Sequence, residues 1–261
     1  MNPVTVRFNK VPMSDPSSPV ALALEHIASG DLAGAQHCLE RDSDCANVSG
    51  YYAEVTKILY ARTKDVRSML ALARAGIDYQ LRAAERVAAD DAGLAITLRT
   101  AARKLAFNVA ANSWPGWGDD GVVIVAADIE DGLNLAKLSL ELVQELALGQ
   151  QQLGTAFWLV GALDLAAGRT DAALASFDQA RACYLAHGDH VQVLLADGYR
   201  AIALGATGDG PDGSLDEVVA RLHRDGSKQA GFFAGQLRTA ARILRDRSPP
   251  GTQMPANTQR L

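Results

Sequence analysis

The chain has 261 residues, of which 48% are hydrophobic and 21% charged, so it can bury a large core as one elongated domain or two. Its formal net charge of −5 argues against a nucleic-acid-binding surface, which needs a concentrated basic face. No apolar run approaches the roughly 20 residues that span a bilayer, and the N-terminus lacks the basic start and apolar block of a signal peptide. Three cysteines, an odd number, favour a reducing cytoplasm. We therefore expect a cytoplasmic protein that binds neither nucleic acid nor membrane, and its many alanines and leucines favour helix.

The N-terminal part is predicted to hold an irregular segment followed by two helices. Residues 1–16 mix proline, serine and aspartate without periodicity, which predicts a flexible segment. A helix is predicted over Ser18–Ser29, followed by a turn at Gly30-Asp31 and a second helix that ends near Arg41.

Two longer helices are predicted next. Apolar residues at three- and four-residue steps predict one helix over Ser49–Ala61 and another over Asp65–Ala89. Gly76, followed two residues later by Asp78, resembles a turn. We favour one long helix over 65–89, with a break at Gly76 as the alternative.

A helix over Ala92–Asn112, capped by Asp90-Asp91, is predicted to end abruptly at residues 113–121, because a proline and several glycines cannot continue it. Val122–Val125 is β-branched and could be a strand fragment or a buried turn. Helix resumes over Asp128–Leu148. We interpret residues 113–127 as an inserted loop, because the spacing of the flanking helix ends exceeds that of the following pair by about this length.

The most regular stretch is Gly154–Gly188, which is predicted to form two antiparallel helices joined at Gly168. Glycine readily adopts the left-handed conformation of a helix end, and Thr170 or Asp171 can cap the second helix. In that helix, small and aromatic residues alternate at steps of four, three and four. They therefore share one face that allows close helix contact.

This stretch resembles the tetratricopeptide repeat (TPR), a helix–turn–helix of about 34 residues. The residues that fall at the family's positions are Phe157, Val160, Gly161, Gly168, Ala173, Phe177 and Ala180. Asp164 and Leu185 depart from the pattern, since the family has a large apolar residue and often a proline there. The resemblance covers one repeat and implies an all-α, right-handed α-solenoid of antiparallel helix pairs, which we extend as a TPR-like domain over residues 17–247.

Degenerate copies flank the central repeat. Gly30 and Gly208 can each be aligned with Gly168, which places small residues in corresponding positions and predicts a helix over Asp189–Leu204. Closing helices are expected over Leu215–His223 and Gln229–Arg245. Residues 248–261 are proline-rich and polar, which predicts a disordered tail.

The inserted loop holds the first candidate site. Trp114 and Trp117, two of the three tryptophans, lie there beside Asp119 and Asp120. The indoles could plug the end of the helix stack, or they could form a recognition patch, because tryptophan is enriched in binding hot spots. We favour the plug and keep these four residues as a candidate partner-binding site.

The second candidate site follows from the resemblance, which implies that Trp158 faces the inner surface of the repeat and that Asp197 and Arg200 point inward or to its rim. A groove lined by an aromatic, an acid and a cation suits an extended peptide. The alternative is that Trp158 packs under a neighbouring helix.

No catalytic constellation stands out. His187 and His190 flank a turn, Cys38 and Cys45 have no second pair of ligands, and the glycine-rich loop before residue 214 lacks the lysine and strand of a P-loop. We expect no enzyme, metal or cofactor. We expect an adaptor or scaffold that binds a protein, a peptide or another copy of itself. A sensor of small molecules or peptides, with a concave pocket, is the alternative.

Overall fold

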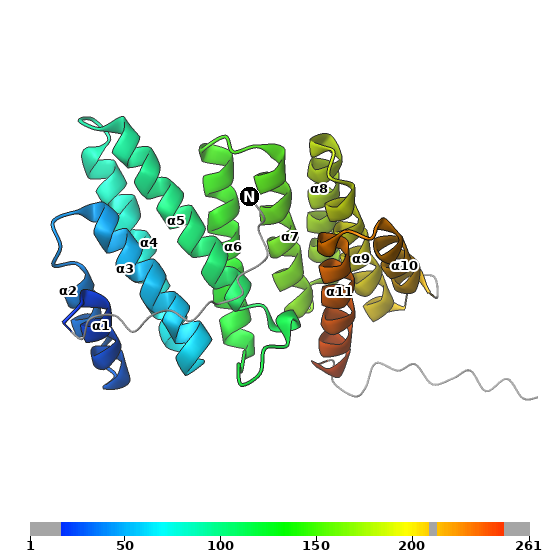
Figure 1. Ribbon diagram of the computed structural model, residues 1–261, viewed down its shortest axis with the longest axis horizontal. Coiled ribbons are helices and arrows are strands. Elements are labelled where there is room, and N and C mark those ends of the chain that lie inside the picture. The colour runs from blue at the N-terminus through cyan, green and yellow to red at the C-terminus, as the bar shows by residue number, and fades with distance from the viewer. Residues whose placement is uncertain (1–16, 209–212, 248–261) are drawn as a thin grey trace, which may run out of the picture. The chain divides into compact units, whose positions relative to one another are not determined.

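The computed structural model describes residues 17–208 and 213–247 (Figure 1). Throughout these ranges the regular structure is helical, and no strand occurs in them. The all-α fold class is thus confirmed. The segments predicted to be flexible, residues 1–16 and 248–261, lie outside the described residues. None of the described helices is long and apolar enough to cross a membrane.

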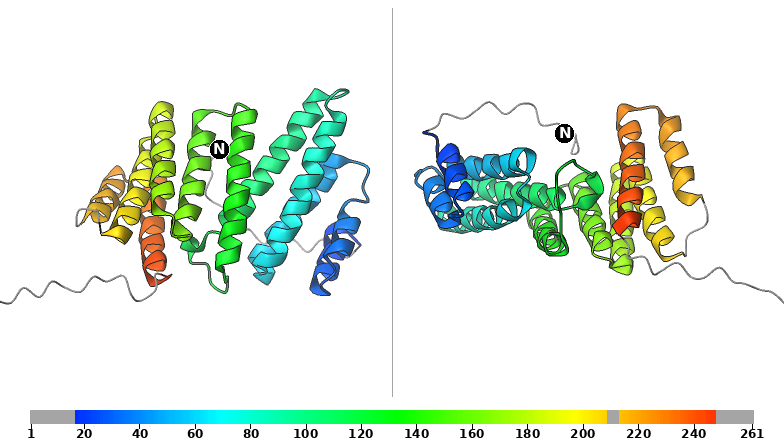
Figure 2. Two further views of the ribbon diagram at one scale, coloured as in Figure 1. Left: turned by 180° about the vertical axis from the view of Figure 1, so that it is seen from behind. Right: turned by 90° about the horizontal axis from the view of Figure 1, so that it is seen from below.

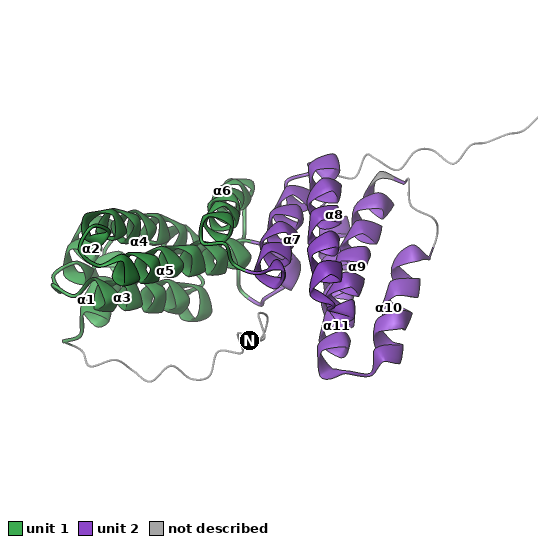
Figure 3. Cartoon of the chain, turned by 90° about the horizontal axis from the view of Figure 1, so that it is seen from above, with its two compact units in different colours: residues 1–113, 121–148 green, residues 114–120, 149–261 purple. Residues whose placement is uncertain are grey.

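The chain divides into two compact units, which Figure 3 shows in different colours. Unit 1 comprises residues 1–113 and 121–148, and unit 2 comprises residues 114–120 and 149–261. The described helices of unit 1 are α1 (Pro19–Ala28), α2 (Leu32–Leu39), α3 (Cys45–Ile58), the π-helical turn η1 (Leu59–Thr63), α4 (Val66–Val87), α5 (Ala92–Asn112) and α6 (Ala126–Glu145). Those of unit 2 are the 3-10 turn η2 (Pro115–Trp117), α7 (Gln150–Ala166), α8 (Thr170–His187), α9 (His190–Thr207), α10 (Ser214–Asp225) and α11 (Lys228–Arg247).

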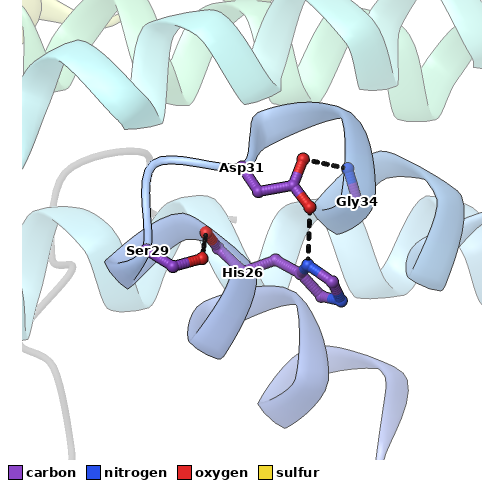
Figure 4. Close-up of polar contacts among 4 residues, drawn as sticks. All are labelled: His26, Ser29, Asp31 and Gly34. Carbon is purple, nitrogen blue, oxygen red and sulfur yellow. Dashed lines mark hydrogen bonds and ion pairs between the residues drawn. The ribbon is translucent and has the colours of Figure 1, made fainter.

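The first turn of unit 1 is held by one carboxylate (Figure 4). Oδ1 of Asp31 accepts a hydrogen bond from the Gly34 backbone N–H at 2.8 Å, and Oδ2 lies 2.9 Å from Nδ1 of His26. The backbone hydrogen bond, and then that of His26, lower the pKa of Asp31. Gly30 adopts a φ of 81°, so the predicted turn is confirmed.

Aspartates also decide where later helices begin. Asp44 accepts from the backbone N–H of Ala46 at 2.8 Å, so α3 begins at Cys45 and not at the predicted Ser49. Asp91 accepts from Leu94 at 2.8 Å and caps α5, as its sequence predicted. In each case a short side chain satisfies a backbone donor that the first turn leaves free.

Helix α4 runs unbroken through Gly76, which confirms the single long helix. A Cβ atom on Gly76 would lie 2.6 Å from Cγ of Tyr52, so the glycine makes room for that ring. Tyr52 is fully buried, and its hydroxyl donates to Glu40 at 2.7 Å. This glycine therefore serves packing between α3 and α4 and does not form a turn.

Glycines also seat aromatic rings between α7 and α8 of unit 2. A Cβ on Gly154 would lie 2.7 Å from the ring of Tyr184, and one on Gly161 would lie 2.7 Å from that of Phe177. Phe177 is fully buried, as expected. Gly168 takes a φ of 78° in the turn that ends α7, as predicted.

Two boundaries of the α7–α8 pair differ from the prediction. Helix α7 begins at Gln150, before Gly154. Neither Thr170 nor Asp171 caps α8, because Arg169 occupies the N-cap position without a side-chain cap. Instead, Nε of Arg169 donates to Asp164 at 2.8 Å. Asp164 is buried at a position where the TPR pattern has a large apolar residue, and its ion pair with Arg169 explains how the carboxylate is accommodated there.

The segment before α6 is neither a strand nor a buried turn. Val123 and Val125 are 73% and 48% exposed, and residues 122–125 have no regular structure. Helix α6 begins at Ala126, two residues before the predicted Asp128, whose side chain accepts from the backbone N–H of Val125 at 3.0 Å. The helix ends at Glu145, and Ala147 adopts a φ of 48°.

Candidate functional site

The loop that follows α5 belongs to unit 2, where it forms the turn η2. Pro115 opens this turn with the fixed φ of its ring. Gly116 lies directly under the indole of Trp114, so that a Cβ there would come within 2.2 Å of the ring. Gly118, with a φ of 68°, ends the turn. The local sequence therefore folds the chain back around the Trp114 side chain.

The three tryptophans meet in one aromatic cluster, defined by Trp114, Trp117, Trp158, Phe177 and Tyr199. The ring centre of Trp114 lies 4.8 Å from that of Trp117, 5.9 Å from that of Trp158 and 5.7 Å from that of Tyr199. Tyr199 also lies 5.5 Å from Trp158 and 5.4 Å from Phe177. Edge-on and tilted contacts at these distances are the favourable arrangements of aromatic pairs. The loop is thus fastened to α7 through Trp158 and to α9 through Tyr199.

Exposure separates the members of the cluster. Trp114, Phe177 and Tyr199 are fully buried, and Trp158 is 2% exposed. Trp117 is half-buried. It is therefore the ring through which the cluster reaches the surface. Trp114 packs as the plug interpretation requires, whereas the recognition role stays a prediction.

The buried polar atoms of the cluster are only partly paired. The hydroxyl of Tyr199 lies 3.0 Å from Nε2 of Gln236 on α11, and burial raises the pKa of Tyr199 well above its usual value. Nε1 of Trp114 and Nε1 of Trp158 have no hydrogen-bond acceptor within the described ranges. An unpaired buried donor costs about 1–3 kcal/mol. Burying roughly 150–250 Å² of indole at about 25 cal/mol per Å² yields about 4–6 kcal/mol, so packing outweighs that cost.

The second candidate pair is engaged by the neighbouring helix. Nε of Arg181 on α8 donates to Asp197 on α9 at 2.7 Å. In the opposite direction, Nε of Arg200 on α9 lies 2.6 Å from Oδ1 of Asp178 on α8. The two ion pairs link the same two helices. The predicted acid and cation therefore each have an internal partner, and Trp158 lies in the aromatic cluster.

The two acidic residues of the loop, Asp119 and Asp120, are exposed. They follow Gly118, which packs against α11: a Cβ there would lie 2.7 Å from Cδ1 of Ile243 and 3.2 Å from Cγ2 of Thr239. All seven candidate residues thus belong to unit 2. Four partners of the candidate residues were not predicted from the sequence, namely Tyr199, Gln236, Arg181 and Asp178. Asp178 and Arg181 nevertheless have the same three-residue spacing as Asp197 and Arg200.

Unit 1 contains a hollow of about 400 Å³ between α2 and α4. Charged and polar side chains make up most of its lining, which comprises Gln36, Glu40, Ala71, Arg74, Ala75, Asp78 and Arg82. Two of these are occupied, because Arg74 pairs with Asp131 and Glu40 accepts from Tyr52. This differs from the mostly apolar lining of a typical small-molecule pocket.

Residues 17–208 and 213–247 contain no group of three or more His, Cys, Asp or Glu side chains that could hold a metal ion. The three cysteines are free thiols. Burial raises the pKa of Cys183, which disfavours its reactive thiolate form.

No family model matches the chain, and no curated protein matches it.

Proposed function

We propose that the chain is a TPR-like interaction module, a right-handed α-solenoid that acts as an adaptor or scaffold in the cytoplasm and binds a protein or peptide without cofactor or catalysis. The close packing of α7 on α8 supports the resemblance, because Gly161 and Phe177 contact each other at two of the family's positions. In repeat proteins each helix pair buries its apolar face against a neighbour and leaves an extended surface for partners.

One observation carries the proposed binding role. Trp117 is half-buried, while the rings of Trp114 and Trp158 behind it are buried. A partly exposed indole on a rigid base is a good anchor, because it is already ordered before a partner arrives. The exposed carboxylates of Asp119 and Asp120 beside it would favour a peptide that carries lysine or arginine.

A sensor of small molecules or peptides is the second candidate function, and the hollow in unit 1 gives it little support. Its lining is mainly polar and charged, whereas the sensor needs a pocket enclosed by apolar residues. We therefore favour the interaction module.

A library of immobilised peptides tests this function. The full chain should retain a set of peptides enriched in basic residues, and Trp117→Ala should weaken their binding by ~10-fold or more, as expected for a hot spot. Tyr51→Ala is the matched control, since Tyr51 is a half-buried aromatic of unit 1. Retention that is equal for the parent and the Trp117 variant would show that the indole is only structural.

A further inference from the structure

The last helix carries an unusual charge for this acidic chain. Helix α11 contains five basic residues and one acidic residue, whereas the whole chain has 25 lysines and arginines against 30 aspartates and glutamates. Arg238, Arg242 and Arg245 are all exposed. Their spacing of four and three residues places them in one row on the helix, at intervals of roughly 6 and 4.5 Å along its axis.

No carboxylate within the described ranges pairs with this arginine row. Arginines that do form ion pairs there, such as Arg74, Arg99, Arg169, Arg181 and Arg200, belong to other helices or their caps. Like charges at three- and four-residue spacing destabilise a helix slightly. Ion pairs of this row with described carboxylates therefore do not hold α11 to unit 2.

Two glycines continue the row towards the start of the helix. Gly231 and Gly235 lie four residues apart, and Gly235 precedes Arg238 by three, so all share one face. A Cβ on either glycine would meet no atom within 4 Å. Gly198 in the same unit is different, because a Cβ there would lie 2.4 Å from Leu237.

Glycine is the poorest helix former after proline. Gly50 in α3 and Gly205 in α9 also have open space at the Cβ position, so the feature that distinguishes Gly231 and Gly235 is their alignment with the arginine row. At Gly76, Gly154, Gly161 and Gly198 a side chain of the fold occupies the space. At Gly231 and Gly235 no described side chain occupies that space, so packing does not explain the glycines. Because they have no side chain, another segment can approach the helix backbone closely there.

The opposite side of α11 is already used by the fold. Phe233, Ala234, Leu237 and Ala240 are buried, and Gln236 reaches Tyr199 on α9. Within unit 2, α11 lies beside α9 and α10 (Figure 2). The face formed by Gly231, Gly235 and the arginine row lies opposite these buried residues. At Arg242 it borders the η2 turn, which also packs on α11, because Nη2 of Arg242 would lie 3.9 Å from a Cβ on Gly118. Phe232, which is 45% exposed, flanks it.

We propose that this face binds an acidic α-helix of another protein, which crosses α11 at Gly231 and Gly235 and places carboxylates on Arg238, Arg242 and Arg245. Arginine binds carboxylates with two parallel hydrogen bonds, and a helical partner can present them at the same spacing as the row. A second copy of this face is not a suitable partner, because its arginines would repel those of the first copy. This inference rests on the proposed interaction module, because it names the class of partner that the module binds. The binding face on α11 is separate from the one at Trp117.

The first test needs no partner. Replacing Gly231 and Gly235 by alanine should raise the melting temperature of the full chain, because alanine is the better helix former and finds free space. If the double alanine variant melts lower than the parent, the glycines serve the fold and the proposed close approach is overturned.

The second test measures binding of a designed peptide. The probe is an alanine-rich helix of about 20 residues with glutamates at i, i+4 and i+7. It should bind the full chain more weakly as salt is added, and replacing Arg238, Arg242 and Arg245 by glutamate should weaken binding by ~10-fold or more. The matched control replaces three exposed arginines of α4 by glutamate, namely Arg67, Arg82 and Arg86.

Further variants and probes distinguish this face from the aromatic cluster and from general charge attraction. Gly231→Ala with Gly235→Ala should also weaken peptide binding, whereas Trp117→Ala should leave it unchanged. Equal weakening by the α4 control would show non-specific charge attraction and overturn the proposal. So would the absence of peptide binding at roughly 1 mM, the weak end of the affinity range. Row-dependent binding to phosphatidylserine vesicles or a single-stranded oligouridine that exceeds peptide binding would overturn it as well.

Discussion

Replacing Trp114 by alanine should destabilise unit 2 more than any other single change in the η2 turn. The side chain is fully buried and contacts the rings of Trp117, Trp158 and Tyr199. Its buried area corresponds to about 4–6 kcal/mol. Removing its unpaired Nε1 donor returns about 1–3 kcal/mol, while the cavity adds a further cost. We expect a net loss of about 3–5 kcal/mol, as for other buried tryptophans.

Thermal unfolding followed by circular dichroism measures this loss. The midpoint for unit 2 should fall by roughly 10 °C or more, and the near-ultraviolet signal of the edge-on indoles should decrease in the folded variant. Trp117→Ala is the control, because its half-buried ring should cost less than half as much. Two results would refute the conclusion that Trp114 holds the η2 turn to unit 2. One is a Trp114 variant whose free energy of unfolding lies within about 1 kcal/mol of the parent, and the other is a Trp117 variant that is equally destabilised.

Two more predictions concern single contacts. Phe177→Ala should cost about 3–5 kcal/mol, and Gly161→Ala should lower the melting temperature because its Cβ would clash with that ring at 2.7 Å; unchanged melting of both variants would contradict the α7–α8 packing. Asp31 has a lowered pKa in the folded chain, so its stabilising contribution is present above about pH 4, the unfolded value, and is lost as pH falls through the folded value. The melting temperatures of the parent and Asp31→Asn should therefore differ more at pH 7 than below pH 4, and a difference that does not change with pH would refute this role.

Much of the helical architecture could be predicted from the sequence because its causes are local. Caps and left-handed glycines act within a few residues, so Asp91 marks the start of α5 and Gly168 the end of the turn after α7. Periodicity of apolar residues identified α4 as one helix. The errors were also local: Asp44 starts α3 earlier than its apolar pattern indicated, because a cap and an apolar face need not begin together.

The functions of particular glycines and charges could not be predicted in this way. Gly76 resembled a turn residue, yet it accommodates Tyr52 from another helix. Asp197 and Arg200 suggested open charges, yet each pairs with α8. The side chain that fills the space above a glycine, or neutralises a charge, lies on a different element, and its sequence position does not reveal it.

Local patterns in the sequence predict that the described residues are mostly helical, where most of their helices begin and end, and which residues are unusual. These properties depend on neighbours three or four positions away. Packing in three dimensions brings Trp114 against Trp158 and Tyr199 and leaves Trp117 half-buried. It also decided which glycines pack under a ring and which, like Gly231 and Gly235, face open space. These outcomes depend on how helices distant in sequence pack in three dimensions, since burial is a property of the assembled core and not of the local pattern.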